Sequence, residues 1–187
     1  MKTVTIGKKE IVLKEEWIIG FVTTWIVGLL AHAYRFFNFL PIWDSIYNFT
    51  GVGSTYTLGR WFLGYAGLIT SMFDLPWING AFSLFYISIV VILVTEIFEI
   101  KNKGMIALCA ALFVSFPTVV SSFAYMYTAD AYLLAFLLST VAIYLTWRVR
   151  KWGMIAGMVC LAFAMGIYQA YATVAIVLVP VSYTHLR

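Results

Sequence analysis

The sequence predicts an all-α integral membrane protein, and its composition carries that prediction. Hydrophobic residues make up 63% of the 187-residue chain, and charged residues only 11%. A soluble globular domain is nearer to about 45–50% apolar. The lysines and arginines gather in short clusters between long apolar runs, a pattern typical of the loops that set membrane orientation. The net charge of +4 therefore does not indicate binding to nucleic acid.

The apolar runs predict about five transmembrane helices. These runs cover residues 17–33, 77–98, 104–122, 131–147 and 154–180. Most of them approach the length of about 20 residues that a spanning helix needs. Pro117 predicts a kink within the third run.

The first run carries a stripe of small residues along one helix face. Gly20, Thr24, Gly28 and His32 recur at every fourth position. Such a stripe lets membrane helices approach one another closely. His32 lies at the outer end of this stripe, so it is either a packing histidine or part of the floor of a site in the following loop.

Residues 61–73 form an apolar run that is too short to span a membrane and predict a helix lying in the interface. With that arrangement, nine of the twelve basic residues share one side with the N-terminus, and the opposite side holds Arg35 and Arg60. Cytoplasmic loops are enriched in lysine and arginine. The N-terminus is therefore expected in the cytoplasm, and residues 34–76 and 123–130 outside.

The outer segment 34–61 is the longest interruption of the apolar pattern, and we interpret it as the core of an active site. It contains Arg35, Asp44 and Arg60. Charges this close to lipid are costly unless they have a function or a partner. A carboxylate can act as a general base, and arginine binds phosphate through paired donors. Two structural readings stay open: an ion pair of Asp44 with either arginine, and snorkelling of Arg60 into the headgroups.

Further polar residues near the outer side are also candidates for the site, and each has a structural alternative that stays open. Asp130 is either an outer acid of the site or the N-cap of the fourth helix. Gln169 and Tyr171 interrupt the last apolar run, where polar residues also serve helix packing. Asp74, beside Pro76, is expected to be a turn or capping residue. The two cysteines each lie inside an apolar run, and without a CxxC motif they indicate neither a zinc site nor a disulfide framework.

Five segments of the chain resemble a known family. In order, they are HAYRFFNFLPIWDSIYNF, LGRWFLG, FDLPWING, FAYMYTADAY and GIYQAY. Together they resemble the bacterial membrane glucosyltransferases of the O-antigen-modifying type, over roughly residues 15–180. That family belongs to the C-type glycosyltransferase superfamily, whose multi-spanning members use a polyprenyl-phosphate sugar as donor.

The resemblance implies a function and roles for particular residues. It implies transfer of a sugar, expected to be glucose, from a polyprenyl-phosphate donor to a cell-surface glycan on the outer face of the bacterial cytoplasmic membrane. The first outer loop carries the catalytic acid in that superfamily, a position that Asp44 matches, and residues 61–73 resemble a juxtamembrane helix. The remaining candidates are expected to bind substrate: Arg60, Arg35, His32, Asp130, Gln169 and Tyr171. Whether a divalent cation takes part is left open.

The resemblance also bears on the extent of the protein. The family continues with further spans, so residues 1–180 are expected to be a single membrane domain, the N-terminal part of a longer glycosyltransferase that could be inactive as a fragment. Residues 181–187, VSYTHLR, do not resemble the family and are expected to be a spurious end. Two other functions stay open: a flippase or transporter of lipid-linked sugar, and a non-catalytic membrane subunit. A transporter favours mid-span charges and paired repeats, whereas the outer charges here lie at span ends and in loops.

Overall fold

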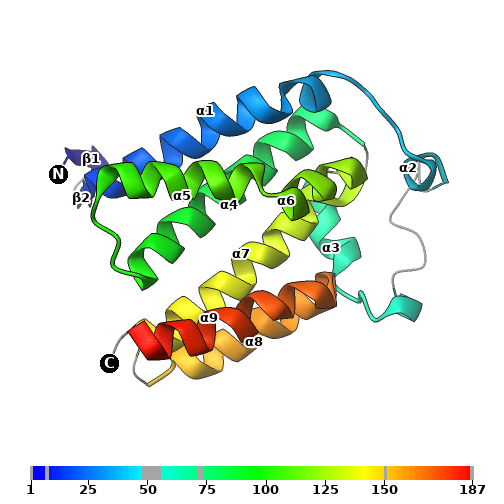
Figure 1. Ribbon diagram of the computed structural model, residues 1–187. Coiled ribbons are helices and arrows are strands. Elements are labelled where there is room, and N and C mark those ends of the chain that lie inside the picture. Colours follow the sequence, from blue (N-terminus) through cyan, green and yellow to red (C-terminus); the bar gives the residue numbers. More distant parts are fainter. Residues whose placement is uncertain (1, 7–8, 48–55, 71–73, 150, 186–187) are drawn as a thin grey trace.

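The structure, a computed structural model, is a bundle of apolar helices and describes residues 2–6, 9–47, 56–70, 74–149 and 151–185. Figure 1 shows both chain ends at one end of the bundle and α2 at the other. The helices, with the 3-10 turns labelled η, are α1 (Glu15–Phe37), α2 (Trp43–Tyr47), η1 (Tyr56–Leu58), α3 (Leu63–Gly67), η2 (Leu68–Thr70), α4 (Pro76–Ile97), α5 (Lys103–Ser115), α6 (Pro117–Ser122), η3 (Phe123–Tyr125), α7 (Met126–Arg148), α8 (Gly153–Ile167), η4 (Gln169–Tyr171) and α9 (Ala172–His185).

The prediction of a helical membrane protein is confirmed. Among the residues that the structure describes, three helical stretches are long and apolar enough to cross a membrane: Glu15–Phe37, Pro76–Ile97 and Lys103–Arg148. The third contains α5, α6 and α7, and Figure 1 shows α7 running back along the bundle in the direction opposite to α5. Shorter apolar helices follow at Gly153–Ile167 and Gln169–Val181.

An N-terminal hairpin, which the sequence analysis did not predict, precedes the helices. Strands β1 (Lys2–Ile6) and β2 (Lys9–Leu13) pair antiparallel, with Lys2 opposite Leu13 and Ile6 opposite Lys9. Both strands are rich in β-branched residues, which favour extended backbone.

Helix α1 packs against α4 and α5, α4 also packs against α7, and α7 packs against α8 and α9. The predicted stripe on α1 is the packing face, because Gly20, Thr24, Gly28 and His32 are all buried. At Gly28, a Cβ atom would lie only 2.4 Å from Cδ2 of Leu84 on α4. Small residues here are therefore a requirement for the close approach of α1 to α4.

The kink at Pro117 is confirmed. Helix α5 ends at Ser115, Phe116 is extended with φ −63° and ψ 139°, and Pro117 begins α6. A residue before proline is driven out of the helical region by contact with the proline ring. Residues 123–130, by contrast, were expected to form a loop, and that expectation was wrong: they form η3 and the first turn of α7.

The fifth predicted span, residues 154–180, is not one continuous helix. Helix α8 ends at Ile167, Tyr168 is extended with φ −157° and ψ 116°, and α9 begins at Ala172. Figure 1 shows α9 running back alongside α8. At the break, the Gly166 carbonyl accepts a hydrogen bond of 2.8 Å from the Phe62 N–H, so a distant segment satisfies one of the carbonyls that the end of α8 leaves free.

The predicted interfacial helix is shorter than expected. Of residues 61–73, the structure forms α3 and η2 over Leu63–Thr70, and residues 71–73 lie outside its described part. The buried residues of α3 are Leu63, Ala66 and Gly67. Leu63 and Ala66 join Ala131, Ala135, Ala164 and Ile167 in a small apolar cluster between α3, α7 and α8.

Candidate functional site

Arg60 lies on a platform of two tyrosines from distant parts of the chain. Its Nη1 donates a hydrogen bond of 3.3 Å to the Tyr132 hydroxyl on α7. Its Cζ lies 4.5 Å from the centroid of the Tyr168 ring, at the break between α8 and η4. The two rings stack with centroids 5.0 Å apart. A guanidinium over an aromatic face is held by cation–π attraction, so the platform fixes the orientation of this cation.

The Arg60 guanidinium has a buried donor that the platform does not use. Its Nε is buried and has no hydrogen-bond partner among the residues that the structure describes. A buried donor without a partner is costly. An oxygen of a bound anion at this position would remove that cost, which makes Arg60 the best-supported anion-binding residue of the candidates.

The loop that carries Arg60 is tied to the break between α8 and α9. The Gln169 side chain donates from Nε2 to the Leu58 carbonyl at 3.0 Å. Gly59 has φ +72°, and a Cβ there would lie 2.7 Å from that Nε2 atom. At Gly166, a Cβ would lie 2.5 Å from the Trp61 ring. Gln169 thus holds the Arg60 loop by its backbone, and its predicted contact with substrate stays a prediction.

Tyr171 belongs to the same cluster of aromatic residues. Its hydroxyl lies 3.3 Å from the Ser122 hydroxyl at the end of α6. Its ring centroid lies 6.1 Å from that of Tyr168. Tyr171 therefore packs against the Tyr168 ring, and a direct role in binding substrate stays a prediction.

Asp44 lies in the first turn of α2 and is exposed. Asp44 and Arg60 both lie within electrostatic range of Tyr127, near the start of α7. The structure thus places the two main candidate residues around one end of α7, although sixteen positions in sequence separate them. The tyrosines at 127, 132 and 168 had no assigned role in the sequence analysis, although all three occur in the motifs FAYMYTADAY and GIYQAY.

The Arg35 side chain connects backbone segments from different parts of the chain. Its Nε donates to the Phe123 carbonyl at 2.9 Å, its Nη2 to the Ala124 carbonyl at 3.1 Å, and its Nη1 to the Leu40 carbonyl. The end of α1 is thereby joined to η3 and to the segment that leads into α2. This geometry favours a positioning role over direct phosphate binding.

His32 is a packing residue in this structure. It is buried, its Nε2 lies 2.9 Å from the Val114 carbonyl on α5, and its ring centroid lies 4.6 Å from that of Phe123. These contacts join α1 to α5 and η3. Of the two roles considered for His32, these contacts favour the packing role.

Asp130 lies one turn inside α7 and is only 1% exposed, so it does not cap the helix. Its Oδ2 accepts a hydrogen bond of 2.9 Å from Thr70, and its Oδ1 accepts one of 3.2 Å from Asn79 Nδ2. Asn79 Oδ1 in turn accepts from the Leu75 N–H at 3.1 Å. This network holds η2 onto α4 and α7. A contact of Asp130 with substrate stays a prediction.

Replacing Asp130 with alanine should lower the free energy of unfolding by about 1–3 kcal/mol, because two buried donors would lose their acceptor. Thermal or denaturant unfolding of the purified protein in detergent measures this. Ser139→Ala is the matched control on the same helix, since the Ser139 hydroxyl is buried without a hydrogen-bond partner among the described residues. Equal stability of the two variants would contradict a structural role for Asp130.

The sequence predicted only a turn or capping role for Asp74, but its position in the structure suggests more. It precedes α4, and both of its carboxylate oxygens are buried without a hydrogen bond of normal geometry to any described residue. Burial raises the pKa of Asp74, and the nearby Arg35 guanidinium and Ser45 hydroxyl oppose the shift. Ser45 follows Asp44 in α2, so Asp74 lies behind the helix that carries the candidate base.

The raised pKa of Asp74 predicts a pH-dependent stability. A carboxyl whose pKa is higher in the folded state stabilises that state fully only below its unfolded pKa of about 3.9, and this stabilisation is lost as pH rises through the folded pKa. Asp74→Asn should therefore unfold at a higher temperature than the unmodified protein at pH 7, with a difference that shrinks toward pH 4. Unfolding midpoints of both proteins, measured between pH 4 and pH 7, test this prediction. A difference between the two midpoints that grows as the pH falls would contradict it.

Within the described part of the chain, no three His, Cys, Asp or Glu side chains come together in a way that could hold a metal ion. The divalent cation that the sequence leaves open thus has no ligand set among those residues. No step of the chemistry below is assigned to it.

Comparison with known proteins identifies the family. The sequence model of glucosyl transferase GtrII matches residues 33–183, which is most of the chain and contains α2, α3, the Arg60 loop and the tyrosine platform. The comparisons with curated proteins and with solved structures each gave no match. The chain therefore belongs to the GtrII glucosyl transferase family.

Proposed function

We propose that this protein transfers glucose from a polyprenyl-phosphate donor to a cell-surface glycan of the O-antigen type, on the outer face of the bacterial cytoplasmic membrane. The observation that carries the proposal is the fixed guanidinium of Arg60, whose buried Nε has no hydrogen-bond partner among the described residues. Arginine suits a phosphate because its planar fork presents several donors in one orientation. The polyprenyl phosphate supplies both the anion and the apolar tail.

An apolar surface next to Arg60 supports the lipid part of the donor. Trp61, which precedes α3, Tyr65 on α3, and Leu68 and Ile69 on η2 are between 43% and 60% exposed. All four lie within nine positions after Arg60 in the chain, so a phosphate on the guanidinium would start its polyprenyl tail along this surface. Large apolar side chains left exposed as a group commonly mark a binding surface.

The reaction needs one base and one stabilised leaving group. The acceptor hydroxyl oxygen forms a bond to glucose C1 while the bond between C1 and the donor phosphate oxygen breaks. The phosphate leaves with the electron pair, and Arg60 stabilises the charge that it gains. Asp44 accepts the proton of the acceptor hydroxyl, a contribution typically worth about 10²–10⁴ in rate.

The decisive experiment measures transfer of radiolabelled glucose from polyprenyl-phosphate-glucose to glycan. Since the resemblance implies further spans, we would assay the 187-residue chain and also a longer family member carrying residues 1–180 of this chain in place of its own. Transfer by the second protein supports the proposal. Movement of the lipid-linked sugar across the membrane without transfer would favour a flippase, and neither activity would favour a non-catalytic subunit.

The outer placement of the site has its own test. Charge counting predicts Ser121, at the end of α6, outside and Lys151, between α7 and α8, inside. Both residues are exposed. With Cys109 and Cys160 replaced by alanine, Ser121→Cys should react with an impermeant thiol reagent in intact cells, whereas Lys151→Cys should react only after permeabilisation. The reverse labelling pattern would overturn the orientation.

A further inference from the structure

A cavity lies at the end of the bundle away from Arg60. It has a volume of about 290 Å³. Its lining includes Glu16 at the start of α1, Glu96 at the end of α4 and Arg148 at the end of α7. These are the ends of all three helical stretches that are long and apolar enough to span a membrane in the described chain. The cavity therefore lies at the level where such helices leave the hydrocarbon and meet lipid headgroups.

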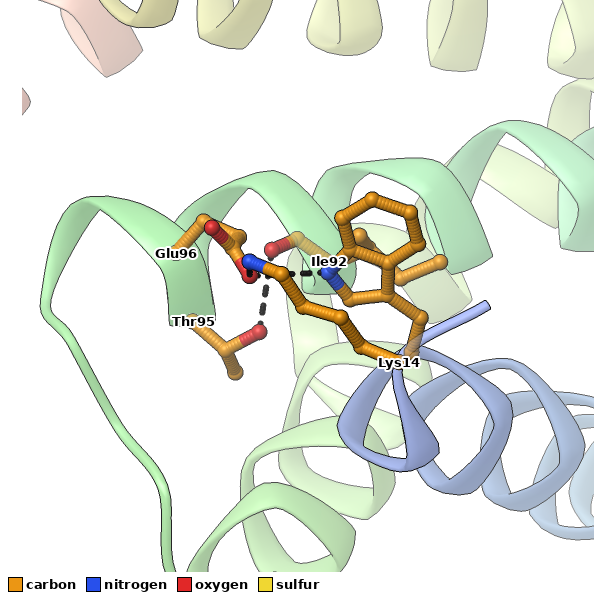
Figure 2. A network of polar contacts seen from close by, with 5 residues as sticks. Lys14, Ile92, Thr95 and Glu96 are labelled. Atoms are coloured by element: carbon orange, nitrogen blue, oxygen red, sulfur yellow. Dashed lines mark hydrogen bonds and ion pairs between the residues drawn. The ribbon is translucent and has the colours of Figure 1, made fainter. Parts of the chain in front are cut away.

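One wall of this cavity is held by a fixed polar network. Lys14 Nζ lies 2.7 Å from Glu96 Oε1, and Trp17 Nε1 donates to the same oxygen at 2.8 Å. Figure 2 shows Lys14 converging on Glu96, next to the bond from Thr95 to the Ile92 carbonyl. Lys14 and Glu96 neutralise each other, so the other charges of the lining decide which ligand would fit.

Those other charges are balanced. Two cations, Lys101 and Arg148, and two carboxylates, Glu16 and Glu99, also line the cavity. None of the four forms an ion pair with another described residue. Arg148 lies over the Trp147 ring, with Cζ 5.1 Å from its centroid. A purely anionic ligand would meet the two carboxylates, and a purely cationic ligand would meet the two cations.

Glu99 has an unusual backbone conformation for its residue type. Its φ is +52°, and it is the one non-glycine residue with positive φ in the described chain. Bonds from Ile100 N–H to the Thr95 carbonyl at 2.9 Å and from Glu99 N–H to the Glu96 carbonyl at 3.3 Å close the end of α4 around it. Glycine usually occupies this position at a helix end. A glutamate that keeps a strained conformation while lining a cavity points to a function of its side chain.

We propose that this cavity binds the headgroup of a zwitterionic phospholipid that carries one phosphate and one primary ammonium. Lys101 and Arg148 bind the phosphate, and Glu16 and Glu99 accept hydrogen bonds from the ammonium. The acyl chains lie along the apolar surfaces of the spanning helices. The site is separate from the donor site at Arg60, so it goes beyond glucose transfer.

The test is the thermal unfolding of the purified protein in detergent with added lipid. Phosphatidylethanolamine should raise the midpoint by about 3–5 °C, because a ligand that binds only the folded state stabilises it. Phosphatidylglycerol, which lacks the ammonium, and phosphatidylcholine, whose quaternary ammonium donates no hydrogen bond, should give less than half of that shift at equal mole fraction. Equal shifts from all three lipids would overturn the proposal. A larger shift from soluble phosphoethanolamine than from phosphatidylethanolamine would show that the ligand is a soluble compound and not a membrane lipid.

Variants of the lining separate binding from folding. Glu99→Gly relieves the backbone strain, so it should raise the midpoint without lipid and abolish the shift with phosphatidylethanolamine. Arg148→Gln should abolish the shift as well. Glu15→Gln is the control, because Glu15 pairs with Lys103 at 2.6 Å and neither residue lines the cavity. A full lipid shift in Glu99→Gly and Arg148→Gln would show that these side chains do not bind the headgroup.

Discussion

Replacing Asp44 with asparagine should lower glucose transfer by about 10²-fold or more while the protein still inserts in the membrane. The substitution keeps the size of the side chain and removes the group that accepts the proton of the acceptor hydroxyl, and a positioned base typically contributes about 10²–10⁴ in rate. Because Asp44 is exposed at the surface of α2, the fold should tolerate the change. Radiolabelled transfer, normalised to the amount of inserted protein, measures the effect.

Asp74→Asn is the matched control for Asp44. It makes the same chemical change at the same end of the bundle, behind the same helix, but at a carboxylate that is buried. Transfer by Asp74→Asn should stay close to that of the unmodified protein. Near-normal transfer by Asp44→Asn would remove Asp44 as the base, and an equal loss in both variants would indicate damage to α2 instead of lost chemistry.

Substitution of Arg60 should give a graded loss that separates phosphate binding from a simple need for charge. Arg60→Ala removes the cation and should lower transfer by about 10²–10³-fold, the cost of losing one donor to developing negative charge. Arg60→Lys keeps the charge but loses the planar fork and the flat contact with Tyr168 at 4.5 Å. Its loss should be intermediate, and both variants should bind the donor more weakly.

The alternative for Arg60 is a charged tip that only reaches the headgroups, and it predicts that lysine substitutes fully. Donor affinity and transfer rate of the two variants decide between these readings. Tyr132→Phe is a useful companion, because it removes the 3.3 Å hydrogen bond to Nη1 and keeps the ring. It should cost less than either arginine variant. Normal donor binding by both arginine variants would exclude Arg60 as the phosphate ligand.

The structure divides the candidate residues by what they contact. Arg60 keeps a buried donor without a partner in the described part of the chain, whereas Arg35 donates to backbone carbonyls and both oxygens of Asp130 accept hydrogen bonds. His32 packs between α1 and α5. These contacts favour Arg60 over the other three as the proposed anion-binding residue, because the other three hold the surrounding elements in place.

The sequence by itself determined the helical membrane class, the packing face of α1 and the break at Pro117. These features depend on local chemistry: the number of apolar residues in a run, the spacing of small residues at every fourth position, and the contact of a proline ring with the residue before it. Each of them is decided within a few turns of one helix. The motifs also pointed to the family to which the chain belongs.

Only the tertiary structure decided where the last apolar run breaks and what surrounds each charge. The run from 154 to 180 has no proline or charged residue before Pro180 that would end a helix, yet α8 ends at Ile167, where the Gly166 carbonyl accepts a hydrogen bond from the backbone N–H of Phe62, about a hundred positions away. In the same way, Tyr132 and Tyr168 meet Arg60 only after α7 and α8 pack together. Hydrogen bonds and burial of this kind depend on segments distant in the chain, and no local periodicity records them.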